Sequence, residues 1–408
     1  MIPRQTWTSG TILSCGLFAA VLAGCSELNQ LIPLGPSVVE TASKWPSFTA
    51  ADEERMARAN ALEFEKTAVL WDDPLLETYV TDLTQRIVAV SKPCPFAYRV
   101  RVVKDPTINA FTFGGGLVYV YAGLIARMEN EAQLAMVLGH EIAHVTEGHV
   151  PEGIQAEFGI KFLGQLAVGA AGEAGAGSLP PGALEKTYQY ALQASINGHG
   201  RTRESEADEV GLEYMFRAGF DPREAPGTFR QLLKEHGDKA PLENFLYGSH
   251  PTNVSRIEHT TKLVEARYAG RITGKTVANS QEFQRRTREL VVATGLMDYE
   301  AKRFQTARAM FEKALSVSLD DPVAPYYLGR IALETGGPGQ IDDAIAHFIA
   351  AMKTDGRYAP ARRELGLAYY RKGDKPQAVA ALEGYLALLP DAPDASRIQA
   401  IVKELERE

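Results

Sequence analysis

The stretch "MVLGHEIAHVTEGHV", from Met136 to Val150, holds three of the eight histidines in this 408-residue chain. His140 and His144 are four residues apart, and Glu141 directly follows the first of them. Histidines at positions i and i+4 share one face of a helix, with Cβ atoms about 6 Å apart, so both rings can reach one metal ion. An amphipathic helix that carries histidines by chance is the alternative, but histidines among apolar residues are costly unless something satisfies them.

The pattern H-E-x-x-H is typical of zinc proteases, in which the glutamate contacts a metal-bound water rather than the metal. A catalytic zinc also needs a third protein ligand and one open position. The later stretch "GRTRESEADEVGLEYMF" offers candidates, because Glu204 and Asp208 are spaced i, i+4 on a predicted helix. A solvated carboxylate on a helix surface is the alternative explanation for Glu204.

The two motifs together resemble the HtpX/CAAX-protease-like family of zinc metalloendopeptidases. The second motif reads R-x-x-E-x-x-A-D and is formed by Arg201, Glu204, Ala207 and Asp208. The segments "DPLLETYV" and "NAFTFGGGLVYVYAGLI" also look like family segments, and "SHPTNVSRI" resembles the H-P-x-x-x-x-R segment of periplasmic members. With the C-terminal repeats described below, the chain looks most similar to the BepA type, periplasmic protease-chaperones of outer-membrane assembly.

This resemblance implies one zinc ion per chain, held by His140, His144 and Glu204. Asp208 would orient a histidine ligand from behind. Glu141 would take a proton from the water that attacks a peptide carbonyl and pass it to the leaving nitrogen. The expected activity is therefore that of a peptide-bond hydrolase.

Three further residues near these motifs have weaker predictions. In periplasmic relatives the histidine of the H-P pair lies close to the metal, so His250 is a candidate for a removable fourth ligand or an oxyanion stabiliser. A surface histidine before a helix-starting proline is the alternative. Arg256 is expected to be a structural ion-pair donor. His149 points off the ligand face, and any role is expected through a carboxylate.

The N-terminal residues predict a lipoprotein signal rather than part of the fold. The apolar run from Thr11 to Gly24 has 14 residues, and crossing a bilayer takes about 20. Its ending, L-A-G-C, resembles the bacterial lipobox, which implies a signal peptide over residues 1–24, a lipid on Cys25 and an outer-membrane position facing the periplasm. An ordinary cleavable signal is the alternative. Residues 25–46 are predicted to be a tether.

Composition and cysteine content indicate the general class of the protein and whether disulfide bonds are expected. The chain is 45% hydrophobic and 23% charged with a net charge of −8, which is typical of a globular protein and gives no basic patch for nucleic acid. After cleavage and lipidation only Cys94 remains as a thiol, so no internal disulfide is expected.

Residues 47–280 are predicted to form a zinc metalloprotease domain of zincin-like α+β type. Charged helices follow Thr49 and Asp73, "YRVRVVKD" alternates as a strand does, and "NAFTFGGGLVYVYAGLI" predicts a strand, a glycine-rich turn and a second strand. An edge strand from "GGGLVYVY" is expected to bind extended polypeptide. The Ala/Gly-rich segment Phe162–Ser178 is either a flap over the cleft or a plain helix.

The C-terminal third repeats with a period near 34 residues, which resembles tetratricopeptide repeats. Three columns share one spacing, in which a small residue, a large one and a third packing residue recur: Ala307, Ala344 and Ala378; Phe311, Phe348 and Leu382; Ala314, Ala351 and Tyr385. Residues 287–405 are therefore predicted to form an α-helical repeat solenoid with a capping helix, which makes the whole chain mainly α. An unrelated helical bundle is the alternative.

These features predict a zinc metalloendopeptidase of the bacterial envelope that cleaves misfolded or stalled envelope polypeptides docked on its repeats. The outer-membrane assembly machinery is a possible partner through the repeats, and the membrane is a partner through the lipid. A repeat-based chaperone or scaffold with restrained proteolysis is the alternative. A soluble zinc hydrolase of small peptides fits the anchor and the repeats poorly.

Overall fold

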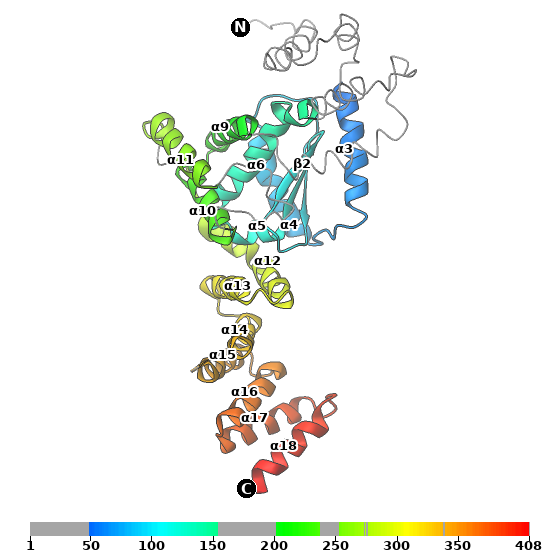
Figure 1. The fold of residues 1–408 in the computed structure, drawn as a ribbon, viewed down its shortest axis with the longest axis vertical. Helices are drawn as coiled ribbons and strands as arrows, with labels where there is room; N and C mark the ends of the chain where they lie inside the picture. The colour runs from blue at the N-terminus through cyan, green and yellow to red at the C-terminus, as the bar shows by residue number, and fades with distance from the viewer. Residues whose placement is uncertain are drawn as a thin grey trace, which may run out of the picture.

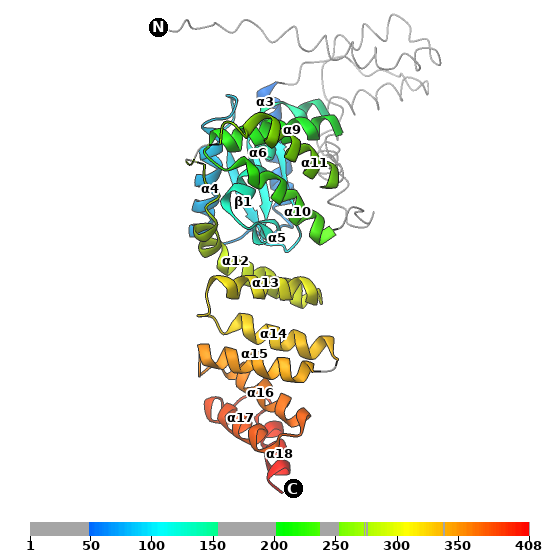
Figure 2. The same cartoon turned by 90° about the vertical axis from the view of Figure 1, so that its left-hand side faces the viewer.

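The computed structural model describes residues 49–153, 201–236, 253–272, 274, 276–337 and 339–407. These residues form an α+β part followed by a column of paired helices (Figures 1 and 2). The predicted fold class, mainly α with a small sheet, is confirmed. Among the helices of the described residues, none is both long and apolar enough to cross a membrane.

A three-stranded sheet forms the centre of the α+β part. It consists of β1 (Arg99–Val103), β2 (Ala110–Gly114) and β3 (Leu117–Tyr121) in the spatial order β1-β3-β2. β3 runs parallel to β1 and antiparallel to β2. The glycine-rich turn between β2 and β3 needs Gly115 and Gly116, whose φ angles are +56° and +78°, because side chains rarely adopt this conformation.

Helices cover both faces of this sheet. α4 (Pro74–Val88) and α6 (Glu131–Thr146) pack on the face that carries Val100 and Val102 of β1 and Val118 and Val120 of β3. α3 (Ala50–Phe64) packs on the other face, against the aromatic side chains of β2 and β3. The strict alternation of side chains along each strand produces these two distinct faces. α6 is therefore held directly against the sheet.

The predicted starts of the first two helices are confirmed by their caps. Thr49 and Asp52 form a capping box at the start of α3, in which each side chain satisfies a backbone N–H. Asp73 accepts hydrogen bonds from the first turn of α4, and Pro74 occupies its first position.

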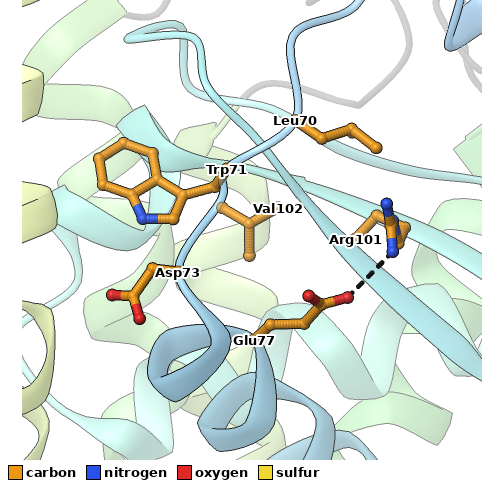
Figure 3. Close-up of a pocket in the computed structure, with 6 residues that line it drawn as sticks. All are labelled: Leu70, Trp71, Asp73, Glu77, Arg101 and Val102. Carbon is orange, nitrogen blue, oxygen red and sulfur yellow. Dashed lines mark hydrogen bonds and ion pairs between the residues drawn. The ribbon is translucent and has the colours of Figure 1, made fainter.

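The prediction that the strand in "GGGLVYVY" lies at an edge of the sheet is wrong. This strand is β3, which lies between the other two strands and is paired on both sides. The outer side of β1 is also occupied. Trp71 N donates to Val102 O at 2.8 Å, and Lys104 N donates to Val69 O at 2.7 Å. Figure 3 shows a hollow beside residues 69–71, which pair with β1. It is lined by Leu70, Trp71, Asp73, Glu77, Arg101 and Val102. None of the candidate metal ligands lines it. β2 is the other outer strand.

The second predicted strand is shorter than "LVYVYAGLI", because the chain turns into the short helix α5 (Ala122–Arg127) after Tyr121. Gly123 allows this turn. Its N–H donates to Asp105 O at 2.9 Å, and a Cβ at this position would lie 2.0 Å from Pro106 O. The strand therefore ends where the backbone approaches the β1–β2 connection.

The C-terminal part confirms the predicted repeats. Its helices pair in sequence order, and all nine residues of the three columns are buried. α18 is the predicted capping helix and packs on α17 through Ile398 and Val402. The helices are α12 (Ser280–Glu300), α13 (Phe304–Val317), α14 (Val323–Thr335), α15 (Gln340–Thr354), α16 (Ala359–Lys372), α17 (Lys375–Leu388) and α18 (Ala395–Arg407).

The two parts share one hydrophobic core, which runs from α4 to α14 and includes the inner faces of α12 and α13. α5 lies at the end of the α+β part that faces these helices (Figures 1 and 2). Buried Asp298 of α12 accepts hydrogen bonds from Arg127 of α5, at 3.2 Å, and from Arg303. The first helix pair of the repeats is thus packed onto the α+β part. The predicted boundary between residues 280 and 287 falls inside α12.

Candidate metal centre

α6 carries the first motif through the middle of the α+β part, and all of its residues are buried. Asn130 caps its start by accepting a hydrogen bond from Gln133 N at 2.9 Å. His140 and His144 lie one turn apart, and their Nε2 atoms are 3.0 Å apart. Both imidazoles therefore present the same nitrogen to one point.

The second motif lies on α9 (Arg201–Arg217), which crosses α6 at two glycines. A Cβ on Gly139 would lie 2.7 Å from Gly211 O, and a Cβ on Gly211 would lie 2.7 Å from His140 N. The two backbones are therefore in direct contact, closer than any side chain allows. The sequence reasoning missed both glycines. The sequence did contain a signal. Gly139 directly precedes the first motif and Gly211 follows the second, and both lie inside predicted helices, where glycine is disfavoured.

This close crossing brings Glu204 to the two histidines. Its Oε2 lies 3.4 Å from His140 Nε2, its Oε1 lies 3.5 Å from His144 Nε2, and its side chain has no solvent exposure. One candidate ligand atom from each residue falls within 4.8 Å of the others. Two imidazole nitrogens and one carboxylate oxygen are the ligand types that catalytic zinc takes in proteins.

The electrostatics of this group favour a cation. Burial by itself lowers the pKa of His140, but hydrogen bonds with Asp208 and Glu204 outweigh this effect and raise the pKa to about 9. The buried carboxylates therefore stabilise positive charge at this point. The residues fit a divalent metal ion, since a buried carboxylate is costly without a cation beside it.

Glu141, the candidate general base, directly follows His140 on α6. It is 4% exposed. Burial raises its pKa to about 7, the charge of Glu204 adds to this rise, and His140 and Arg256 oppose it. A carboxyl with a pKa near neutral can both accept and return a proton under ordinary conditions.

Asp208 lies behind His140, where the family resemblance puts it. His140 Nδ1 is 2.9 Å from Asp208 Oδ1. Arg256 of α11 (Asn253–Leu263) donates to both carboxylate oxygens, at 2.6 and 2.9 Å, and its guanidinium lies over the ring of Phe229. Burial alone would raise the pKa of Asp208, but the charge of Arg256 and the hydrogen bonds from His140 and Arg256 together outweigh it and hold the pKa at about 2. The predicted ion-pair role of Arg256 is confirmed.

His149 has a partner that the sequence reasoning did not name. Its Nδ1 lies 2.9 Å from His144 Nδ1, and its Nε2 lies 3.2 Å from Glu206 Oε2. Gly148, with a φ of +75°, turns the chain after α6 and so makes this contact possible. Glu206 has a 52% exposed side chain and is not in the candidate metal group.

Three predicted features lie outside the described residues: His250, Cys25 and the segment Phe162–Ser178. Cys94 is half-buried and free, with its Sγ 3.4 Å from Tyr98 Oη.

Two regions of the chain match known protein families. Residues 72–264 match the model of Peptidase family M48, and residues 337–402 match a tetratricopeptide repeat model. The beta-barrel assembly-enhancing protease of Escherichia coli (strain K12) is 28% identical over 278 residues, which cover 65% of this chain and 54% of that protein. The protein of that name in Yersinia pestis is 28% identical over 258 residues, covering 60% and 51%.

The metalloprotease LoiP of Escherichia coli (strain K12) is 27% identical over 255 residues, which cover 61% of this chain and 94% of that protein. The chain thus spans about half the length of the assembly-enhancing proteases, with 51% and 54% covered. The family match contains α4, the sheet, α6, α9 and α11, and hence every described residue of the candidate centre. Residues 72–264 are therefore a Peptidase family M48 domain, and tetratricopeptide repeats follow it in the chain.

Proposed function

We propose that this chain is a zinc-dependent metalloendopeptidase of the bacterial cell envelope. The observation that carries the proposal is the buried group of His140, His144 and Glu204, whose candidate ligand atoms lie within 4.8 Å of one another. The carboxyl of Glu141 is buried, and the charges of His140 and Glu204 act on it. The family match and the relatives named as proteases support the same activity.

In this mechanism His140, His144 and Glu204 hold the ion. When bound, the ion supplies Lewis acidity toward a peptide carbonyl and makes an attacking water more acidic. Glu141 accepts the proton of that water and delivers it to the leaving nitrogen. Asp208 holds a proton on Nδ1 of His140, which leaves Nε2 free to face the ion.

We infer that the substrates are misfolded or stalled envelope polypeptides, docked on the repeats. Two relatives are named beta-barrel assembly-enhancing proteases, which supports a link of this chain to the assembly of envelope proteins. A lipid on Cys25 would hold the chain at the outer membrane, facing the periplasm. Replacing this residue, Cys25→Ala, should then release the protein into the soluble fraction, and membrane association that survives the change would argue against the anchor.

The test combines metal content with hydrolysis of casein, an unfolded substrate. Wild type should hold one zinc and lose activity with a chelator, while His140→Ala, His144→Ala and Glu204→Ala should each lose most of the metal. Glu141→Gln should keep the metal and lose hydrolysis. The assignment fails if Glu204→Ala retains full zinc, or if Glu141→Gln cleaves casein as wild type does.

The same variants separate the chaperone alternative from the protease. If the chain is a chaperone, the wild type and Glu141→Gln should suppress the aggregation of an unfolded envelope protein equally well, and neither should cleave it. A protease requires turnover that depends on both the metal and this carboxyl.

A further inference from the structure

The two histidines of the motif are supported differently on the side away from the candidate metal position. His140 meets a carboxylate, Asp208, at 2.9 Å, and that carboxylate is itself bound by a guanidinium. His144 meets another imidazole. Its Nδ1 lies 2.9 Å from Nδ1 of His149, whose Nε2 lies 3.2 Å from Glu206 Oε2. His149 is 1% exposed, so no solvent replaces this contact.

The direction of these hydrogen bonds follows from the protons that each ring carries. A neutral imidazole has one N–H donor and one acceptor nitrogen. Nε2 of His144 faces Nε2 of His140 at 3.0 Å and Glu204 at 3.5 Å, so it must offer its lone pair there if it is to bind a metal. Its proton is then on Nδ1, which lies 2.9 Å from Nδ1 of His149 and donates to it.

His149 must therefore accept at Nδ1 and carry its own proton on Nε2. That proton points to the carboxylate of Glu206, and an ionised carboxylate acts only as a hydrogen-bond acceptor. The hydrogen bonds then run from His144 to His149 and from His149 to Glu206.

We propose that His149 and Glu206 are positioning residues for His144, which hold its ring in the orientation and tautomer that offer Nε2 to the metal. The proposal rests on the metal centre of the proposed function and extends it to two residues that neither motif specifies. Outer partners of metal-binding histidines contribute about 10- to 100-fold to metal affinity. Glu206 contributes less than His149, because half of its side chain is exposed at 52% and water screens it.

The experiment compares two substitutions of His149 in the full-length mature chain. His149→Asn places an amide oxygen near the position of the ring Nδ1, so it keeps the acceptor. His149→Leu fills a similar volume without an acceptor. Zinc and cobalt dissociation constants are measured by competition with a chromophoric chelator, and thermal unfolding of the metal-free proteins monitors the fold.

We expect His149→Leu to weaken metal binding about 10- to 100-fold and His149→Asn to stay within about threefold of wild type. A purely structural role for His149 predicts the opposite order, since leucine suits a buried site better than asparagine. Equal affinities of His149→Leu and wild type, or equal losses in both variants, overturn the proposal. So does a wild type that binds no divalent metal.

A second pair of variants on α9 keeps the test decisive if His149→Leu does not fold. Glu206→Ala should weaken metal binding by about two- to tenfold, at or below the low end of the outer-partner range. Glu209→Ala is the matched control, because Glu209 pairs with His259 and Arg267 on the surface. Equal affinities for these two variants overturn the proposal. The readout is metal affinity, so the two proposals fail separately. A wild type that binds metal but cleaves nothing contradicts the proposed peptidase activity, while the affinities of the variants still test the roles of His149 and Glu206.

Discussion

At the scale of single residues, the distance between α6 and α9 decides whether a metal centre exists. The ligands lie on two helices that are far apart in sequence, so their separation depends on what stands between the helices. Gly139 and Gly211 leave nothing there, and the backbones touch. A carboxylate and two imidazoles can then converge without any strand or loop between them.

We expect Gly211→Ala to weaken metal binding and lower stability. Its Cβ would lie 2.7 Å from His140 N, and backbone atoms cannot yield as a flexible side chain does. Overpacking of this kind costs about 1–3 kcal/mol, and moving α9 outward moves Glu204 with it. Chelator competition and thermal unfolding measure the two effects. Gly270→Ala is the control, since nothing lies within 4 Å of its added Cβ; identical behaviour of the two variants would contradict the argument.

The proposed role of His250 is also tested by one substitution. If this histidine is a removable fourth ligand, His250→Ala keeps the zinc and raises proteolysis, including self-cleavage, because the open position becomes available to water. Unchanged activity would rule out the restraint. Reduced activity would instead support a role in stabilising the oxyanion.

At the scale of elements, each repeat is locked by a glycine in one helix and a large side chain in the next. Added Cβ atoms on Gly295, Gly329 and Gly366 would lie 2.9, 2.6 and 2.6 Å from the nearest atoms of Phe311, Phe348 and Leu382, respectively. The large residue fills the space that the missing side chain leaves. Helix pairs therefore approach closely at the same level in every repeat.

Truncating one of these side chains should unfold the column locally. Phe348 is fully buried, so Phe348→Ala is expected to lower the free energy of unfolding by about 3–5 kcal/mol. Leu319 is 70% exposed, and Leu319→Ala should change it by less than about 0.5 kcal/mol. Urea unfolding measures both, and a small effect of Phe348→Ala would show that the helices close over the cavity.

A lysine of α13 binds the end of α5 and makes stability depend on pH. Lys313 Nζ donates to Ala126 O and Met128 O, both at 2.6 Å, and burial lowers its pKa from 10.5 to about 8. Between these two pH values the unfolded chain binds more protons than the folded chain, so the free energy of unfolding rises with pH.

The comparison is with Lys313→Met, which removes this titration and keeps the length of the side chain. The free energy of unfolding of wild type should increase relative to the variant by about 1–3 kcal/mol between pH 8 and pH 10. Urea unfolding across this range measures the difference. A difference that stays constant or shrinks would show that the lysine is not desolvated in the folded protein.

At the scale of the whole molecule, the first repeat helices pack onto the M48 domain and share its hydrophobic core. One hydrophobic core extends from α4 to α14, and the buried ion pair of Arg127 with Asp298 crosses the junction. A substrate docked on the column would thus lie on a body whose first helices contact α5, which immediately precedes α6, the helix of the two candidate histidine ligands, in the chain. Damage at the junction should reach both parts.

We expect Asp298→Ala to destabilise the M48 domain as well as the repeats. The change removes the carboxylate partner of Arg127, whose side chain is 5% exposed, and removing one member of a buried ion pair costs about 3–5 kcal/mol. Hydrogen exchange in α5 and α6, together with thermal unfolding, follows the effect. Asp342→Ala removes an exposed ion pair with Lys372 and is the control, with little change expected. Faster exchange confined to α12–α18 would contradict a shared core.

The sequence by itself determined the elements that local chemistry specifies. Side chains at i and i+4 on α6 and α9, the caps at Thr49 and Asp73, and the repeat columns all depend on neighbours within a few residues or on a constant period. Such patterns can be read from a single chain. They predicted the fold class, the repeat architecture and the helices that carry the candidate ligands.

Only the tertiary structure decided which groups meet. Strand order placed β3 in the centre of the sheet and removed the expected edge, because pairing partners are chosen by packing across the whole domain. The contact of His149 with His144 required the turn at Gly148, and the helix crossing required Gly211. These distances depend on long-range packing, which local periodicity does not encode.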